Sequence, residues 1–262
     1  MESRQLSNGL EIPVLALGVW QIRNGRDCVN AVRWVLDLGY RHIDTAQLYG
    51  NGESVGRAAR ESRLPARSCS SPPSSPRRVP IRCPRPEGSL RRLGLDYVDL
   101  YLVHWPQRDH TWVWPGMEKA QRLGYTRSVG LSNNGVGEMD EVMGSAEIRP
   151  VVNQVQFSPF EYRRALLDGA VRHQIVVEAY SPLGTGRHLA DRRVSEVASR
   201  VGRSPAQVLL RWCLQRDTVV LPKSSHRDRI EENAQIFDFD PSDADMADLD
   251  RLDRTGGTGE AG

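Results

Sequence analysis

The chain has few of the patterns that would assign it to the secreted, metal-binding or membrane-spanning classes of protein. Its 262 residues include four cysteines, none in a Cys-x-x-Cys pair, so neither a disulfide framework nor a zinc site is predicted. The longest apolar run, residues 13–20, is far shorter than the ~20 residues that cross a bilayer. The chain opens on polar residues rather than on a basic and then apolar leader. We therefore expect a soluble, cytoplasmic protein without a metal site or a membrane partner.

Lysine is almost absent, since Lys119 and Lys223 are the only two lysines among 35 basic residues. The formal net charge of +2 has a local origin. Residues 63–92 carry eight arginines and one acidic residue, so the remainder of the chain has a net charge of −5. An acidic remainder argues against a general nucleic-acid-binding surface, and we expect no nucleic-acid partner.

Apolar segments of strand length alternate with segments of helical period along most of the chain. Near-continuous apolar segments predict strands that end at Gly18 and strands at residues 40–44, 98–106, 126–133, 151–157, 175–184 and 218–224. Helical patterns lie between them at residues 27–38, 53–60, 116–123, 162–172, 195–201 and 204–216. This alternation indicates a parallel sheet covered on both faces. With a short amino-terminal hairpin at Asn8-Gly9 and room for one more strand, we predict an α/β fold, a single (β/α)8 TIM barrel domain over residues 1–262.

The third strand and helix of that barrel fall in a segment of foreign composition. Residues 63–86 contain seven of the sixteen prolines, with clustered serines and arginines, and show neither helical nor strand period. The one strand candidate, residues 79–82, is interrupted by Pro80. We interpret this region as degenerate and hypothesise that residues 63–92 are translated out of frame in an otherwise intact gene. The hypothesis fails if the other two reading frames of the DNA encode no strand and helix.

Residues 40–56 bring two chemically useful groups together. A short strand ends on Asp44, a turn leads to Tyr49, and a helix starts near residues 51–53. A carboxylate at a strand end and a phenol at the mouth of the next loop are suited to acid chemistry. The alternative is a plain strand–loop–helix junction with an N-capping residue and a packed tyrosine. The stretch alone leaves both interpretations open.

Motifs in one order along the chain resemble those of the aldo-keto reductase family: LGVWQ (17–21), HIDTAQLYGNGESVG (42–56), LYLVHWP (100–106), VGLSN (129–133), VNQVQFSPF (152–160), EAYSPLG (178–184) and LPKSSHRDRIEEN (221–233). The chain looks most like the bacterial branch that reduces 2,5-diketo-D-gluconate and related carbonyl compounds. The resemblance implies a TIM barrel, in agreement with the periodicity. It also implies a cytoplasmic oxidoreductase that uses NADPH to reduce the carbonyl group of small aldehydes, ketones or keto-sugar acids.

By this resemblance Asp44, Tyr49 and His104 are three of four catalytic residues. Tyr49 would protonate the carbonyl oxygen, His104 would orient it, and Asp44 would pair with a lysine that lowers the pKa of the tyrosine from its usual ~10. The chain departs from the family at that lysine, which is expected near residues 74–78, where arginines but no lysine occur. A guanidinium is wider than an ammonium and no like-for-like replacement. Because general acid help is commonly worth ~10²–10⁴-fold, the activity of this chain would fall by that order.

The resemblance also implies how NADPH and the substrate are held. The cofactor-binding residues would be Ser132, Asn133 and Gln154 at the nicotinamide carboxamide, Tyr180 on its ring, Ser181 and Leu183 at the pyrophosphate, Lys223, Ser224 and Arg229 at the 2′-phosphate, and Glu232 and Asn233 at the adenine. Cations near a helix start form an anion site, whereas the alternative for Lys223 is an exposed surface cation. The substrate would contact Trp20, Tyr49, His104 and Trp105. The alternative for Trp105 is an ordinary core residue.

Three functions remain to be separated. The leading one is the NADPH-dependent carbonyl reductase. The second is an NADPH-binding pseudoenzyme, or an impaired reductase that lacks the catalytic lysine and has two unpaired strand edges where the third strand is missing. A phosphate-binding barrel isomerase is disfavoured because it needs neither Tyr49 with His104 nor a 2′-phosphate site. The expected partner is a small-molecule carbonyl substrate, the expected state is a monomer, and the tail after Arg254 is expected to be flexible.

Overall fold

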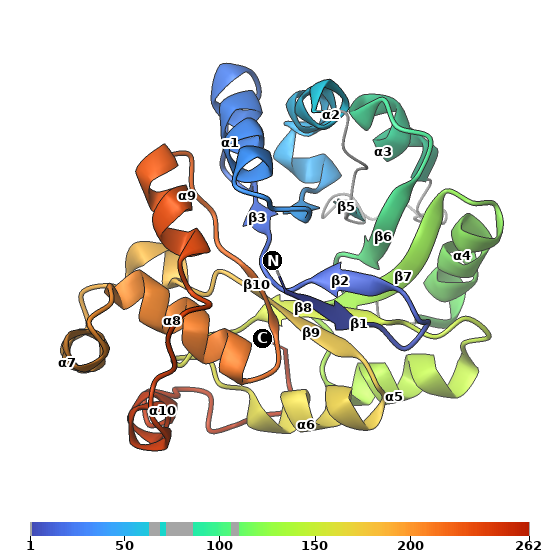
Figure 1. Cartoon of the computed structure of the whole chain (residues 1–262). Helices are drawn as coiled ribbons and strands as arrows, with labels where there is room; N and C mark the ends of the chain where they lie inside the picture. Colours follow the sequence, from blue (N-terminus) through green and yellow to red (C-terminus); the bar gives the residue numbers. More distant parts are fainter. Residues whose placement is uncertain (1, 63–68, 72–85, 106–109, 262) are drawn as a thin grey trace.

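The computed structural model describes residues 2–62, 69–71, 86–105 and 110–261, with the backbone alone for 69–71 and 110–112, and shows strands ringed by helices (Figure 1). Within these residues, eight parallel strands form a barrel: β3 (Leu17–Gly18), β4 (Ile43–Asp44), β5 (Cys69–Ser71), β6 (Val98–Val103), β7 (Thr126–Ser132), β8 (Val152–Gln156), β9 (Val176–Tyr180) and β10 (Val219–Leu221). The prediction of a (β/α)8 TIM barrel is confirmed.

Backbone hydrogen bonds link β3 to β4 and β5 through β10 in chain order, and they join the last strand to the residues ahead of the first. β5 to β10 form one parallel sheet, β3 pairs with β4, and β4 lies beside β5. Ahead of β3, the Ala16 N–H donates to Val220 O at 2.9 Å, and the Val220 N–H donates to Val14 O at 2.8 Å. The first and last strands therefore meet, as closure of a barrel requires.

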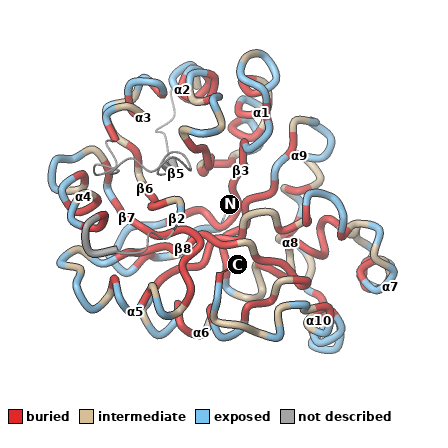
Figure 2. The backbone as a smooth tube through the Cα atoms, turned by 180° about the vertical axis from the view of Figure 1, so that it is seen from behind, coloured by how far each residue is buried: buried red, intermediate tan, exposed pale blue. Residues whose placement is uncertain are grey.

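Helices cover the outside of the barrel, with buried faces toward the strands and exposed faces toward solvent (Figure 2). They are α1 (Arg26–Asp37), α2 (Gly52–Glu61), α3 (Pro86–Leu93), α4 (His110–Arg122), α5 (Val136–Ser145), α6 (Arg164–Arg172), α7 (Arg192–Val201), α8 (Pro205–Gln215), α9 (Arg227–Ala234) and α10 (Asp243–Asp250), with the 3-10 helices η1 (Gln47–Tyr49) and η2 (Gly184–Gly186). α8 begins where the sequence predicts, because Ser204 caps it and Pro205 fits its first position.

The predicted hairpin closes one end of the barrel. β1 (Ser3–Gln5) pairs antiparallel with β2 (Glu11–Pro13), and Gly9 in the turn has φ 83, a left-handed conformation that favours glycine. Leu6 and Ile12 pack with apolar residues at or near the amino ends of the strands, among them Val152 and Val219. The hairpin therefore leaves the carboxyl ends of the strands as the open end of the barrel.

The third barrel position is occupied by β5, inside the segment in which the sequence shows no strand pattern. Residues 69–71 pair in parallel with residues 101–103 of β6, and α3 follows. Pairing of this kind uses backbone groups, so small polar residues can make it without an apolar pattern. The predicted degeneracy is therefore not confirmed at β5 and α3, and β6 has a neighbour at the edge predicted to be unpaired. The remainder of 63–86, including the candidate strand at 79–82, lies outside the described residues.

The carboxyl-terminal tail, predicted to be flexible, is packed onto α5 and α6. Gly259 O accepts the Val136 N–H at 2.9 Å, and Gly257 O accepts the Ala165 N–H at 3.1 Å. These N–H groups lie in the first turns of the two helices, where a helix has no partner for its own donors. Carbonyl groups of the tail therefore cap both helices, a role that a glycine-rich sequence does not reveal.

Candidate functional site

One large cavity, of about 1040 Å³, opens at the carboxyl ends of the barrel strands. In barrel enzymes this end carries the active site. The cavity is lined by all sixteen residues that the sequence assigned to a site: Trp20, Asp44, Tyr49, His104, Trp105, Ser132, Asn133, Gln154, Tyr180, Ser181, Leu183, Lys223, Ser224, Arg229, Glu232 and Asn233. The fold therefore brings every one of them to one place, and their individual roles stay predictions.

Asp44 and Tyr49 are held by the junction between β4 and α2. β4 ends on Asp44, which is buried, and η1 turns the chain so that Tyr49 lines the cavity. Gly50 ends η1 with φ 67. Asn51 stands at the N-cap position of α2 without making a cap bond, and its side chain donates instead to Val19 O at 2.9 Å. Asn51 thereby ties the loop after β3 to the residues that carry Tyr49.

Tyr49 and His104 lie next to each other in the wall of the cavity, with their rings edge to face. Their ring centroids are 6.4 Å apart with an interplanar angle of 75°. His104 follows β6, and burial lowers the pKa of its imidazole below the ordinary 6.5. Its backbone carbonyl accepts a hydrogen bond from Asn133 Nδ2 at 3.0 Å, which fixes the strand end. A phenol and a neutral imidazole, both hydrogen-bond donors, therefore stand together at the site.

The ends of β7, β8 and β9 carry a cluster of hydrogen-bonded polar side chains. Ser132 Oγ donates to Gln154 O at 2.9 Å, and Asn133 Nδ2 donates to Ser132 Oγ at 3.1 Å. Tyr180 Oη donates to Asn133 Oδ1 at 2.9 Å, and burial raises the pKa of this phenol, so it stays a donor. The cluster orients amide and hydroxyl groups along one side of the cavity.

Beneath this cluster, two buried carboxylates share one amide. Gln154 Nε2 lies 3.0 Å from Asp44 Oδ1 and 2.9 Å from Glu178 Oε2. Glu178 is fully buried on β9, and burial raises the pKa of its carboxyl to about 7, although the hydrogen bond from Gln154 opposes this. His42 Nε2 lies 3.5 Å from Glu178 Oε1. Sequence reasoning missed Glu178 and His42, and the available signal was an ionisable residue inside a segment expected to be buried.

Two cations lie where the chain leaves β10 for α9. Lys223 and Arg229 are exposed, line the cavity, and form no ion pair within the described part of the chain. Arg227, which does not line the cavity, donates to Glu231 at 2.8 Å. Ser224 Oγ accepts the His226 N–H at 3.1 Å just before the helix starts. Unpaired cations beside a helix start form an anion site.

Strained backbone is concentrated at the cavity. Gln21, Asn133, Ser181 and Thr185 all line it and have φ values of 59, 58, 49 and 56. This left-handed region costs a residue with a side chain roughly 1–3 kcal/mol, and such residues cluster at functional sites. The surrounding structure therefore enforces the backbone shape of this wall.

The cavity has further lining residues that sequence reasoning missed, among them Gln21, Leu48, Gln156, Pro182, Gly184, Arg187, Leu189, Pro205 and Ala206. Most lie in loops after strands, where no periodic pattern marks them. Leu48 is 62% exposed, and Trp20 and Trp105 are each 45% exposed, so the mouth has an apolar rim. The alternative of Trp105 as a core residue is therefore wrong.

Within the described ranges, no group of three or more His, Cys, Asp or Glu side chains is placed to hold a metal ion. No helix in the same ranges is long and apolar enough to cross a bilayer. Residues 74–78, where the family lysine is expected, lie outside the described part of the chain.

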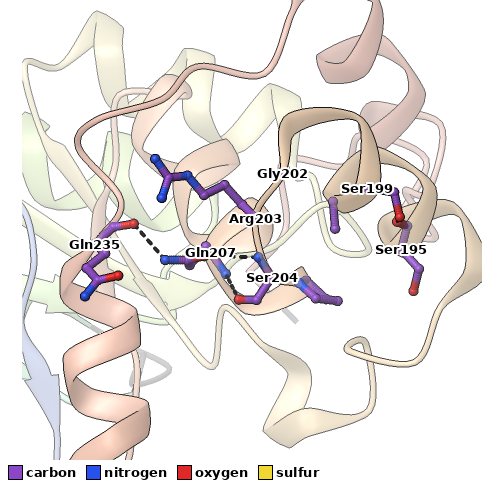
Figure 3. Close-up of a pocket in the computed structure, with 9 residues that line it drawn as sticks. Ser195, Ser199, Gly202, Arg203, Ser204, Gln207 and Gln235 are labelled. Carbon is purple, nitrogen blue, oxygen red and sulfur yellow. Dashed lines mark hydrogen bonds between the residues drawn. The ribbon is translucent and has the colours of Figure 1, made fainter.

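A second, smaller hollow lies between α7 and α8 (Figure 3). Its volume is about 470 Å³, and two of its lining residues, Ser204 and Gln207, belong to the start of α8. Gln207 N–H donates to Ser204 Oγ at 3.2 Å, and Gln207 Nε2 donates to Gln235 O at 2.9 Å, as Figure 3 shows. Ser204 and Gln207 on this hollow thus form the cap of α8.

Comparisons with known proteins agree with the geometry of the main cavity. The profile of the Aldo/keto reductase family matches residues 84–254. The chain is 37% identical to the 9,11-endoperoxide prostaglandin H2 reductase of Trypanosoma cruzi over 94% of this chain and 90% of that protein. It is 39% identical to the glyoxal reductase of Bacillus subtilis over 95% of this chain and 92% of that protein.

Solved structures give the same result for the fold. The aldose reductase of Schistosoma japonicum superposes with a TM-score of 0.86 and 33% identity, over 97% of this chain and 92% of that one. An aldo/keto reductase of Brucella melitensis also gives a TM-score of 0.86, with 34% identity over 96% of this chain and 99% of that one. Sequence, fold and cavity therefore agree, and the chain belongs to the aldo/keto reductase family of oxidoreductases.

Proposed function

We propose that the protein is an NADPH-dependent reductase of small carbonyl compounds, with Tyr49 as the general acid. The observation that carries the proposal is the contact between Tyr49 and His104, whose ring centroids are 6.4 Å apart and which both line the large cavity. Two neutral donors side by side suit a carbonyl oxygen that gains negative charge as it is reduced.

The residues of the chain would divide the chemistry between them. NADPH supplies a hydride to the carbonyl carbon when it is bound. Tyr49 gives its hydroxyl proton to the carbonyl oxygen, and His104 donates a hydrogen bond that orients the same oxygen. Because burial lowers the pKa of His104, the imidazole is neutral at neutral pH and adds no positive charge beside the phenol. Asp44 is buried below them and accepts a hydrogen bond from Gln154 Nε2 at 3.0 Å.

The chain's own groups fit NADPH at both ends of the cavity. Gln154, Ser132 and Asn133 offer buried amide and hydroxyl groups of the kind that pair with a carboxamide. Lys223 and Arg229 offer unpaired cations for a 2′-phosphate. A cation pair at this position favours NADPH over NADH, because NADH has a hydroxyl group in place of the phosphate.

The apolar mouth suggests the substrate class. Trp20 and Trp105, both exposed at the rim, offer flat walls to a small molecule. The similar Bacillus subtilis protein is named a glyoxal reductase. We propose small aldehydes, ketones and keto-sugar acids, with compounds like 2,5-diketogluconate included, as the substrates of this chain.

One observation favours a second candidate, an NADPH-binding protein with impaired or no catalysis. The sequence holds no lysine before Lys119, although the family resemblance implies one near residues 74–78. Without that cation Tyr49 is a weaker acid at neutral pH, because a nearby positive charge is what favours loss of a phenol proton. Both candidates share the cofactor site and differ in turnover.

Binding and turnover measurements on one preparation separate the candidates. Both predict that NADPH fluorescence changes on binding, and only the reductase predicts NADPH oxidation with glyoxal or 2,5-diketogluconate. Binding without oxidation of any aldehyde or diketone tested would favour the pseudoenzyme. Failure to bind NADPH would refute both.

A further inference from the structure

Glu178 has no part in the chemistry proposed above, yet it lies fully buried under the cavity. Its Oε2 accepts a hydrogen bond from Gln154 Nε2 at 2.9 Å, and the same nitrogen donates to Asp44 Oδ1 at 3.0 Å. A side-chain amide has two N–H donors on that nitrogen. Both are thus directed at carboxylate oxygens.

This arrangement fixes which way the Gln154 amide points. Turning the amide by half a turn would place its carbonyl oxygen against the carboxylates of Asp44 and Glu178, and two acceptors repel each other. The unturned amide directs Oε1 away from both carboxylates. Gln154 is 3% exposed and lines the cavity, and its Oε1 accepts no hydrogen bond from the described residues.

His42 supports Glu178 from the side away from the amide. His42 Nδ1 lies 3.2 Å from Pro13 O, which only accepts, so Nδ1 carries a proton. The other nitrogen, Nε2, lies 3.5 Å from Glu178 Oε1. One further proton, on either Nε2 or Oε1, leaves the buried pair neutral overall, and Oε2 accepts from Gln154 in both cases. The raised pKa of Glu178 agrees with a proton held between the two groups.

We propose that Glu178, backed by His42, is a positioning residue that fixes the Gln154 amide, so that Oε1 is presented to the cavity as an acceptor for the carboxamide N–H of the nicotinamide. The inference rests on the proposed function, because it takes NADPH as the ligand of this cavity. Glu178 orients the Gln154 amide and does not take part in proton transfer. The amide lies between two carboxylates and could pass a proton from one to the other only by changing its tautomer.

Cofactor binding in matched pairs tests this role without relying on activity. Glu178→Leu removes the acceptor at similar volume and should weaken NADP⁺ binding about tenfold, as expected for a misoriented buried hydrogen bond. The 3-acetylpyridine analogue of NADP⁺ has a methyl group in place of the carboxamide nitrogen, so its affinity should change less than about twofold. Glu178→Gln keeps an acceptor toward Gln154 and should restore NADP⁺ binding.

Lys223→Met is the matched control, because it acts at the other end of the cavity and should weaken both cofactors equally. Equal weakening of both cofactors by Glu178→Leu, or no weakening, would overturn the positioning role while leaving the proposed function intact. If the wild-type protein binds neither cofactor, the proposed function fails and takes this inference with it.

A measurement on the wild-type protein decides the case if Glu178→Leu does not fold. The Nε2 protons of Gln154, assigned by comparison with Gln154→Met, should exchange with solvent at least ~100-fold more slowly than those of a free glutamine, since both are hydrogen-bonded in a buried place. Exchange at the free rate would overturn the inference.

Discussion

Removal of the two unpaired cations beside α9 should reduce the preference for NADPH over NADH. Lys223 and Arg229 line the cavity and have no ion-pair partner in the described ranges, so both are available to a phosphate. The chain offers a matched control in Arg227, which is on the same helix, lies outside the cavity lining and donates to Glu231 at 2.8 Å. Methionine at each position keeps the aliphatic stem and removes the charge.

The expected magnitude follows from the exposure of both side chains. A well-formed hydrogen bond to a charged group contributes ~1.5–3 kcal/mol. Exposed charge pairs contribute only ~0.2–1 kcal/mol, because water and salt screen them. Because Lys223 and Arg229 are exposed in the unbound chain, we expect each to contribute about 1 kcal/mol to the binding free energy of NADPH, or about fivefold in affinity. The double variant should therefore lose roughly 30-fold for NADPH if the two effects add.

The assay is the dissociation constant of NADPH and of NADH, measured by cofactor fluorescence at two salt concentrations. Both single variants should weaken NADPH binding and leave NADH binding within about twofold, and added salt should shrink the difference. Arg227→Met should change neither constant. Equal weakening of NADPH and NADH, or loss of NADPH binding in Arg227→Met alone, would refute the assignment of the phosphate site.

Three further predictions concern stability. Asp253→Ala should lower the free energy of unfolding by about 1–2 kcal/mol in urea titrations. The Asp253 carboxylate accepts hydrogen bonds from the N–H groups of Tyr162 and Gly257 and so holds the tail that caps α5 and α6. The control is Asp37→Ala, at the exposed end of α1, which should leave the free energy of unfolding unchanged. Burial raises the pKa of Glu178 from 4.5 to about 7, so its contribution to stability is present below pH 4.5 and is lost as the pH rises toward about 7. The free energy of unfolding of Glu178→Gln, taken relative to wild type, should therefore increase by on the order of 3 kcal/mol between about pH 4.5 and about pH 8. An equal difference between the two proteins at both pH values would contradict this cause. His104 has a lowered pKa, so stability is lost as the pH falls below 6.5, and His104→Asn should lessen that loss in the same titrations.

The barrel was predictable because its strands carry near-continuous apolar runs and its helices carry apolar stripes. β7 and α8 show this well, since their predicted bounds lie within a residue or two of the observed ones. α4 starts before its predicted bound of residue 116, because Pro115 interrupts the helical pattern without ending the helix. β5 was not predictable, since a three-residue strand held by backbone pairing leaves no pattern in its side chains.

The candidate site was predictable where motifs mark strand ends and not where the fold joins distant segments. Asp44, Tyr49 and His104 follow recognisable strands, and the cavity contains all three. The contact between Gln154 and Glu178 links two strands in the barrel interior, and no spacing rule connects such residues. Leu48 was missed because a single exposed leucine carries no signal until its neighbours are known.

Tyr49→Phe tests whether Tyr49 supplies the proton in carbonyl reduction. The substitution removes one hydroxyl group and keeps the ring that faces His104. We expect Tyr49→Phe to oxidise NADPH with glyoxal at least ~100-fold more slowly than wild type, with the dissociation constant of NADPH within about twofold. Tyr97, a partly exposed tyrosine outside the cavity lining, is the control, and Tyr97→Phe should change neither quantity. Equal rates for wild type and Tyr49→Phe would contradict this role of Tyr49.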